Sequence, residues 1–274
     1  MKNKETQLNA KAAQLEKAIE ALDERHATSF PDLFYDFLDL HLSFFCNNPD
    51  EHQQKLFKRL KQDEQYNERF IAAMKAYGDA AEGYNDPLGD MFMYRISHGQ
   101  NGQFFTPTHV CEFMARILDP MAETINDPCC GSGRLILAGL KVARENKQEP
   151  LVYANDLSIT CSKMTLLNLC INSAGGEVSC GNSLMLDYDN FRFFKLDRLR
   201  PFFGGAALST YWQYTLADVE QVDEQRKTWY DARLLEGWVS ANLTTKNTRE
   251  TPKIEPQPLP IEIKVEANGQ LALF

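Results

Sequence analysis

The stretch Asp127-Pro128-Cys129-Cys130-Gly131-Ser132-Gly133 decides the fold, because it places a carboxylate and a glycine-rich turn directly after Thr124-Ile125-Asn126, the expected end of a strand. Residues 134–145 have the apolar spacing of a helix, and the segment Leu151-Val152-Tyr153-Ala154 then leads to a second carboxylate, Asp156. This alternation predicts two strands with a helix between them. Carboxylates at the ends of two such strands, with glycines in the first turn, are typical of sites that bind an adenosine-containing cofactor.

The glycines and carboxylates also indicate which adenosine cofactor fits. Gly131 and Gly133 let the backbone approach a ligand closely, because no Cβ atom stands in the way. Asp156 is expected to accept hydrogen bonds from both ribose hydroxyls. The glycine pattern is shorter than the G-x-G-x-x-G of dinucleotide sites, and an acid at Asp127 suits an ammonium group better than phosphates. These features favour S-adenosylmethionine, although the turn alone is also compatible with an ordinary connection between a strand and a helix.

Short motifs accompany the turn along residues 86–185. They are Asp86-Pro87-Leu88-Gly89-Asp90, Gly102-Gln103-Phe104-Phe105-Thr106-Pro107, the stretch 127–133, Ala154-Asn155-Asp156 and Gly181-Asn182-Ser183-Leu184. In their order and spacing they resemble the motifs of the adenine-N6 DNA methyltransferases. Within that family the chain is most similar to the modification (methylase) subunit of type I restriction–modification systems. The resemblance implies a Rossmann-like, S-adenosylmethionine-dependent domain that methylates adenine in DNA as part of a modification system.

The same resemblance implies a set of cofactor-binding residues and no metal. Phe105 to Pro107 are expected to cover the methionine end of S-adenosylmethionine, and Asn182, with Ser183, is expected near the adenine. The full expected set is Phe105, Thr106, Pro107, Asp127, Pro128, Gly131, Ser132, Gly133, Asp156, Asn182 and Ser183.

The catalytic motif of the family is not intact in this sequence. Methyl transfer to N6 acts on a base flipped out of the duplex. The family accepts its amino hydrogens with a tetrapeptide of Asn, Asp or Ser, then Pro-Pro, then Phe or Tyr, and this chain contains no Pro-Pro. At the expected distance stands Arg200-Pro201-Phe202-Phe203, a degenerate candidate, since the guanidinium of Arg200 has donors and no acceptor. A surface strand and turn over residues 199–205 is the alternative, and Ser209-Thr210-Tyr211 is a weaker candidate motif.

Apolar residues at helical spacing predict a helical N-terminal domain over residues 1–100. We expect one helix within residues 6–25 and a second that begins at Ser29 and Pro31. The second is broken at Asn47-Asn48-Pro49, and a third helix is expected over residues 50–77.

The alternation of strands and helices then predicts an α/β methyltransferase-like domain over residues 101–240. Its sheet is expected to be parallel and doubly wound. It is also expected to be truncated, because residues 206–250 offer no obvious set of further strands. Residues 241–274 are expected to form a proline-rich tail.

Charge and cysteine usage bound the functions that are open to the chain. Its 274 residues carry 29 Lys and Arg against 38 Asp and Glu, a formal net charge of −9. Since contacts to phosphate dominate DNA affinity, we expect DNA binding to need help from a partner subunit. Seven cysteines without metal-type spacing indicate reduced thiols and a cytoplasmic location. The absence of a long apolar run and of a signal-like N-terminus argues against membrane association.

The last residues suggest a separate interaction. Gln270-Leu271-Ala272-Leu273-Phe274 resembles the peptide with which bacterial replication and repair proteins bind the β sliding clamp. In such peptides apolar side chains fill a cleft and the glutamine anchors by hydrogen bonds. Gln270, Leu271, Leu273 and Phe274 are therefore the expected partner-binding residues. The alternative is that these residues form the last strand of the fold.

Two functional hypotheses follow from the sequence, and a third is disfavoured. The first is an adenine-N6 DNA methyltransferase that works with a partner. The second is a catalytically degenerate protein that binds S-adenosylmethionine and a DNA or sliding-clamp partner without transferring methyl groups. The third, an NAD-dependent enzyme, is disfavoured by the glycine spacing and by the segment Phe104 to Pro107.

Overall fold

The computed structural model describes residues 10–25, 27–97, 104–118, 123–184, 191–198, 208–215, 263–265 and 271–273. Its helical elements before the sheet are α1 (Ala10–Glu20), α2 (Phe30–Ser43), α3 (Glu51–Gln62), α4 (Glu64–Ala81), α5 (Pro87–Phe92), a π-helical turn (Met93–Ser97) and α6 (Thr108–Ile117). The helical character expected before the sheet is therefore present. None of the helices in this described part is long and apolar enough to cross a membrane.

The starts of these helices follow from their capping residues. Ser29 caps α2 and accepts a hydrogen bond from the Asp32 N–H, with proline in the first turn, as the sequence predicts. The single helix expected over residues 50–77 is wrong. The chain breaks at Asp63, whose side chain accepts a hydrogen bond from the Tyr66 N–H at 2.9 Å and so caps α4. Asp63 ends α3 and caps α4. In the sequence, such an aspartate cannot be distinguished from a polar residue on the surface of one continuous helix.

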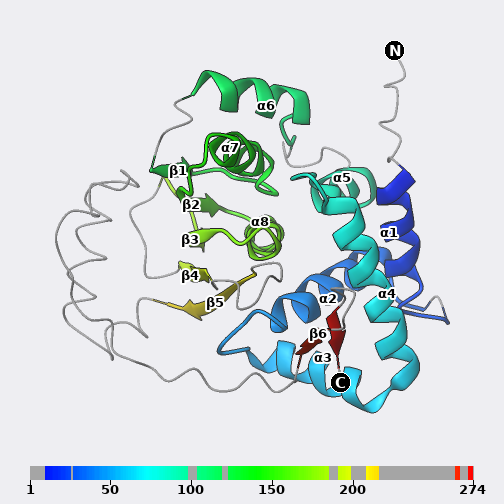
Figure 1. Ribbon diagram of the computed structural model, residues 1–274. Helices are drawn as coiled ribbons and strands as arrows, with labels where there is room; N and C mark the ends of the chain where they lie inside the picture. Colours follow the sequence, from blue (N-terminus) through cyan, green and yellow to red (C-terminus); the bar gives the residue numbers. More distant parts are fainter. Residues whose placement is uncertain are drawn as a thin grey trace.

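The sheet contains the expected Rossmann-like unit. It consists of β1 (Thr124–Asp127), α7 (Arg134–Glu145), β2 (Leu151–Asp156), α8 (Ile159–Ile171) and β3 (Gly175–Cys180). The strands β1, β2 and β3 are parallel neighbours in that order. Successive crossovers in one direction place their helices on one face of a sheet, and Figure 1 shows α7 and α8 on the same side. The α/β prediction is confirmed, although the described strands show no reversal of order such as a doubly wound sheet has.

The expectation of a wholly parallel sheet is wrong, because β4 (Arg192–Arg198) and β5 (Ser209–Tyr214) extend it in antiparallel fashion. In β4, Phe194 and Leu196 are buried on one face, whereas Lys195 on the other face is exposed. Phe193, on the same face as Lys195, is buried as well. Apolar residues on both faces hide the period of two that marks a half-buried strand. The sequence pattern therefore did not reveal this strand pair.

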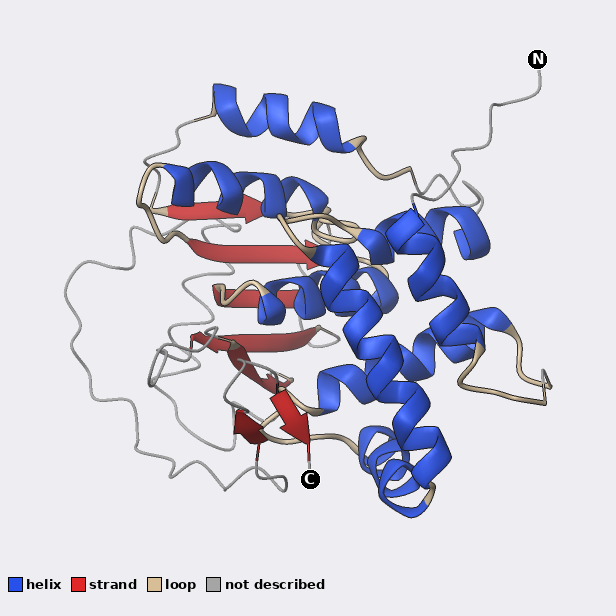
Figure 2. Ribbon diagram, turned by 45° about the vertical axis from the view of Figure 1, so that its right-hand side comes forward, coloured by secondary structure: helices blue, strands red, loops and turns tan. Residues whose placement is uncertain are grey.

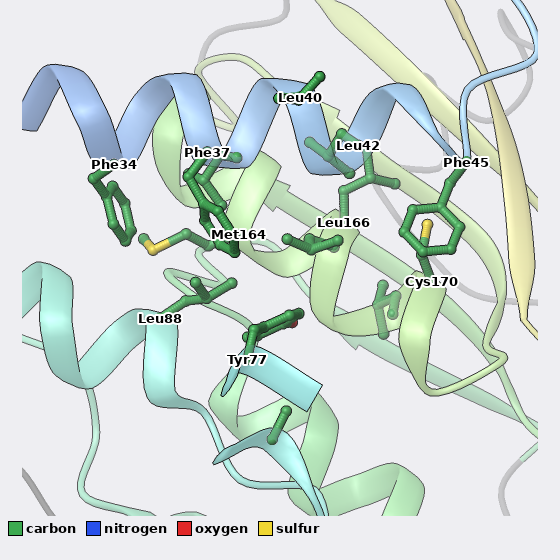
Figure 3. Close-up of a cluster of buried hydrophobic side chains, with 14 of the residues drawn as sticks. Phe34, Phe37, Leu40, Leu42, Phe45, Tyr77, Leu88, Met164, Leu166 and Cys170 are labelled. Atoms are coloured by element: carbon green, nitrogen blue, oxygen red, sulfur yellow. The ribbon is translucent and has the colours of Figure 1, made fainter. Parts of the chain in front are cut away.

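The N-terminal helices and the α/β part share one hydrophobic core. Helix α8 lies between the sheet and the N-terminal helices (Figures 1 and 2). Figure 3 shows Phe34 and Phe37 of α2 facing Met164 and Leu166 of α8. Side chains on all sides of α8 are buried, as expected for a helix packed on two opposite faces.

Near the end of the chain, β6 (Ile263–Val265) and β7 (Leu271–Leu273) form a separate antiparallel pair. The expected partner-binding residues Leu271 and Leu273 are thus part of a strand, whereas Gln270 and Phe274 lie outside the described residues.

Candidate functional site

The turn between β1 and α7 is held in one conformation by hydrogen bonds from β2 and α8. The Gly131 N–H donates to Oδ2 of Asp156 at 2.8 Å, and the Gly131 carbonyl accepts from the Thr165 hydroxyl at 2.9 Å. Gly131 and Gly133 have φ values of +58° and +86°, which residues with a Cβ atom rarely adopt. A Cβ on Gly133 would also stand 2.9 Å from Oγ1 of Thr165. Both glycines are therefore required by the backbone itself.

Three strand ends meet beside this turn and are joined by the buried side chain of Asn155. Its Nδ2 donates to the Pro128 carbonyl at 3.2 Å and to the Gly181 carbonyl at 2.9 Å, while Oδ1 accepts from the Ser179 hydroxyl at 2.8 Å. Asn155 was not among the expected site residues. A polar residue at a buried strand position is the sequence signal that could have identified it.

Asp156 is oriented by the protein before any ligand arrives. Its Oδ2 accepts from Gly131 N–H and its Oδ1 accepts from Ser158 N–H, both at 2.8 Å. A carboxylate offers about four lone-pair sites, so that each oxygen keeps capacity for a second donor such as a ribose hydroxyl.

Asp127 is the second carboxylate at this edge of the sheet. Its Oδ1 accepts from the Cys129 N–H at 3.0 Å. Burial raises the pKa of Asp127 above its usual value, and the charge of Asp156 raises it further, whereas the Cys129 hydrogen bond lowers it. A carboxylate whose charged form is disfavoured in this way is stabilised by a nearby cation. The edge is therefore electrostatically suited to a positively charged ligand.

The segment before α6 covers one side of the turn. A Cβ on Gly131 would lie 2.9 Å from the ring of Phe105, which also stacks on Phe92 with 5.9 Å between ring centroids. Thr106 and Pro107 are exposed, and α6 begins directly after them. The structure thus brings Phe105 against the glycine-rich turn.

Four other expected site residues lie around the turn or just beyond β3. Ser132 is buried, and its hydroxyl donates to Oδ2 of Asp86 at 2.5 Å, so that its side chain serves the fold. Pro128 is exposed beside the turn. Asn182 and Ser183 are half-buried just beyond β3, where Oδ1 of Asn182 accepts from the Leu184 N–H at 3.0 Å.

The degenerate catalytic candidate, Arg200, Pro201, Phe202 and Phe203, lies outside the described residues. The strand before it, β4, is antiparallel to β3, with Cys180 paired to Arg192 and Gly176 paired to Leu196. It therefore ends at the edge of the sheet opposite Asp127 and Asp156.

The weaker candidate, Ser209-Thr210-Tyr211, is part of the packed fold and is wrong as an acceptor motif. The Ser209 hydroxyl donates to the Ala174 carbonyl at 2.6 Å. Tyr211 is buried, and its hydroxyl accepts from Gln53 at 3.1 Å.

Comparisons with known proteins agree with the motifs. Residues 84–198 match the N-6 DNA Methylase family. The chain is 28% identical over 192 residues to the type I restriction enzyme MpnII methylase subunit of Mycoplasma pneumoniae, covering 68% of this chain and 32% of that protein. It is 29% identical over 115 residues to the MjaVIII methylase subunit of Methanocaldococcus jannaschii, covering 39% of this chain and 20% of that protein. The chain thus spans about a third or less of the length of these relatives.

Two solved structures are similar at low identity. One is a putative class I S-adenosylmethionine-dependent methyltransferase from Listeria monocytogenes, with a TM-score of 0.41 and 12% identity, covering 61% of this chain and 52% of that one. The other is a type I restriction-modification system methyltransferase subunit from Streptococcus thermophilus, with a TM-score of 0.33 and 19% identity, covering 68% and 42%. The family match confirms the sequence resemblance for residues 84–198.

Proposed function

We propose that this chain, whose residues 84–198 match the N-6 DNA Methylase family, binds S-adenosylmethionine at the carboxyl ends of β1, β2 and β3. The strongest support is that two carboxylates, Asp127 and Asp156, lie on either side of the turn that contains Gly131. Ligands of parallel α/β sheets bind at the carboxyl ends of the strands. A site with two carboxylates at that edge fits a cofactor that carries an ammonium and a sulfonium.

Charge also argues against a dinucleotide. Arg134 directly follows the turn, but its guanidinium is held by Asp86 at 3.1 Å and by Asp90 at 2.6 Å. These two carboxylates neutralise the cation that would otherwise favour a pyrophosphate at the start of α7. The local balance is therefore acidic, which is the opposite of what a phosphate group needs.

Each part of the cofactor has a proposed partner among the residues at this edge. Asp156 would accept the ribose hydroxyls with the lone pairs that its two backbone hydrogen bonds leave over. Asn182 and Ser183 would lie near the adenine, and Asp127 would face the positively charged methionine end. Phe105, Thr106 and Pro107 would cover that end from the side of α6.

The reaction we propose is methylation of adenine N6 in DNA within a modification system, carried out together with a partner. Held by these residues, S-adenosylmethionine would supply the methyl group for the adenine amino nitrogen, which would release one proton to water. The sequence lacks the acceptor tetrapeptide, and β4 leads away from the edge with the carboxylates. These two observations support a partner chain as the source of the acceptor group and of DNA recognition.

A degenerate protein that binds the cofactor without transferring its methyl group is the second candidate, and the same two observations favour it. The experiment that separates the candidates has two parts. Calorimetry with S-adenosylmethionine and with NAD tests the cofactor, and we expect binding of the first only. Transfer of a labelled methyl group to DNA, with and without a type I specificity subunit, then tests catalysis. No binding of S-adenosylmethionine would overturn the proposal.

The partners we propose are DNA, held with the help of another subunit, and the β sliding clamp. The second rests on the resemblance of residues 270–274 to clamp-binding peptides. Docking of that kind would require β7 to separate from β6.

A further inference from the structure

A buried carboxylate outside the candidate cofactor residues contacts the glycine-rich turn. Asp86 caps α5 and its side chain is only 1% exposed. Its Oδ2 accepts from the Ser132 hydroxyl at 2.5 Å and from Nε of Arg134 at 3.1 Å. Its Oδ1 accepts from the Gly89 N–H at 2.9 Å and from Nδ2 of Asn168 at 3.1 Å. Four donors therefore satisfy this buried charge.

Asn168 of α8 extends these contacts to the N-terminal helices. Its Nδ2 donates to Asp86 and also to the Ser132 carbonyl at 2.9 Å. Its Oδ1 accepts from the hydroxyl of Tyr77, a fully buried residue of α4, at 2.7 Å. A continuous chain of hydrogen bonds thus runs from α4 to the backbone and the side chain of Ser132.

The approach of α5 to the turn leaves no room for an intervening side chain. A Cβ on Gly89 would lie 2.0 Å from Oδ2 of Asp86 and 2.4 Å from the Ser132 hydroxyl. Glycine at this position therefore allows the cap of α5 to contact the turn directly.

Asp86, Ser132, Asn168 and Tyr77 form one buried hydrogen-bonded network. Removing one of these side chains leaves the others with unpaired polar atoms, which costs more free energy than an ordinary hydrogen bond contributes to stability. Ser132 stands between Gly131 and Gly133, so that any loosening of its contacts acts on the turn that would receive the cofactor. The hydroxyl of Tyr77 is joined to that turn by hydrogen bonds through Asn168.

We propose that Asp86 is a positioning residue, which fixes the glycine-rich turn through Ser132 and makes its order depend on the packing of the N-terminal helices through Asn168 and Tyr77. The consequence for cofactor affinity rests on the proposed function. The mechanical link itself does not depend on it.

The experiment compares two buried tyrosines that each lose one hydroxyl. Tyr77→Phe breaks the contact to Asn168. Tyr211→Phe, the matched control, breaks the contact to Gln53 at 3.1 Å and, within the described residues, makes no hydrogen bond to the turn. Hydrogen exchange of peptides covering residues 128–136 is measured in the cofactor-free full chain, beside the thermal midpoint of each variant. Asp86→Asn is the second, stronger variant.

We expect exchange in residues 128–136 to become about fivefold faster in Tyr77→Phe, the size of effect that loss of one hydrogen bond gives. Asp86→Asn should accelerate it further, and Tyr211→Phe should leave it unchanged although its thermal midpoint also falls. Equal exchange in Tyr77→Phe and Tyr211→Phe would overturn the proposal, whether or not Asp86→Asn folds.

Calorimetry with S-adenosylmethionine provides the second readout. We expect the Kd of Tyr77→Phe to rise, by at most the factor by which its exchange rate rises, because only the ordered turn binds, and that of Tyr211→Phe to stay within error. A wild-type chain that binds no S-adenosylmethionine would contradict the proposed function, while the exchange measurement would still decide the positioning role of Asp86. Unchanged affinity in Tyr77→Phe alongside faster exchange would overturn the consequence for the cofactor.

Discussion

The Asp156 carboxylate accepts the Gly131 N–H at 2.8 Å and so ties the end of β2 to the turn after β1. The residue that is expected to bind the ribose is therefore also the residue that shapes the turn. A substitution at Asp156 acts on both, and its effects on affinity and on stability have to be measured separately.

Asp156→Ala should weaken S-adenosylmethionine binding by roughly 1.5–3 kcal/mol, the range for hydrogen bonds to a charged group. Calorimetry measures this directly. Glu145→Gln is the control, because it also removes one negative charge but does so far from the turn. Glu145 is the last residue of α7 and is paired with Arg116. Equal affinity in Asp156→Ala and in the control would refute the assignment.

Gly131→Ala should destabilise the chain by about 1–2 kcal/mol, since alanine is strained at positive φ, and the new methyl would press on the Phe105 ring. Gly78→Ala is the matched opposite. Gly78 lies inside α4 with nothing within 4 Å of its Cβ position, and the change should stabilise the helix by about 0.5–1 kcal/mol. Urea unfolding measures both, and a stabilising Gly131→Ala would show that the turn is not held as described.

His41 should make the stability of the chain sensitive to acid. Burial lowers the pKa of His41 from 6.5 to about 3, and its Nδ1 has no hydrogen-bond partner among the described residues. Between these values the unfolded chain binds a proton that the folded chain does not, so that stability falls as pH falls through that range.

The measurement is the free energy of unfolding of wild type and His41→Phe from pH 7.5 to 4.5. The difference between the two curves isolates His41 from carboxyl groups that also titrate there. It should change by about 1.4 kcal/mol per pH unit below the unfolded pKa. Parallel curves would mean that His41 does not remain neutral in the folded chain.

Methyl transfer by the isolated chain should be weak or absent on any DNA. The reasons are the missing acceptor tetrapeptide and the net charge of −9. Tritium-labelled S-adenosylmethionine and genomic DNA test this, with a known adenine-N6 methyltransferase as the positive control. Robust incorporation at adenine N6 by the pure chain would restore the view that it is a complete enzyme.

Docking on the β sliding clamp should depend on residues 270–274, with Leu273 and Phe274 carrying most of the affinity. A pull-down with purified clamp compares the full chain with one that lacks these residues. We expect capture of the full chain only. If neither form binds and the shortened form loses thermal stability, β7 contributes to the fold and the docking prediction is wrong.

The parts of the fold that could be predicted from sequence have local signals. The cap at Ser29, the glycines of the turn and the carboxylates at the ends of β1 and β2 are each marked by a few neighbouring residues. The break at Asp63 was missed because one polar residue inside a helical pattern has no distinctive signal. Strand β4 was missed because Phe193 and Phe194 are buried on opposite faces.

The contacts that hold the candidate site were harder to predict, because they join residues far apart in the chain. Asp86 lies 46 residues before Ser132, and Tyr77 lies 91 residues before Asn168. No spacing rule links such pairs. The motif that contains Asp86 was visible in the sequence, but its role as a buried acceptor follows only from the packing of α5 on the turn.

Helix α8 has a consequence for how this protein can have been assembled in evolution. One face of α8 belongs to the sheet, and another is covered by Phe34 and Phe37 of α2. If recombination joined the first hundred residues of another protein to this α/β part, Met164 and Leu166 would be exposed to water. They would stay buried only if the new helices carried apolar side chains that match them. The helical part and the cofactor half are therefore expected to have been inherited together, as one unit of selection.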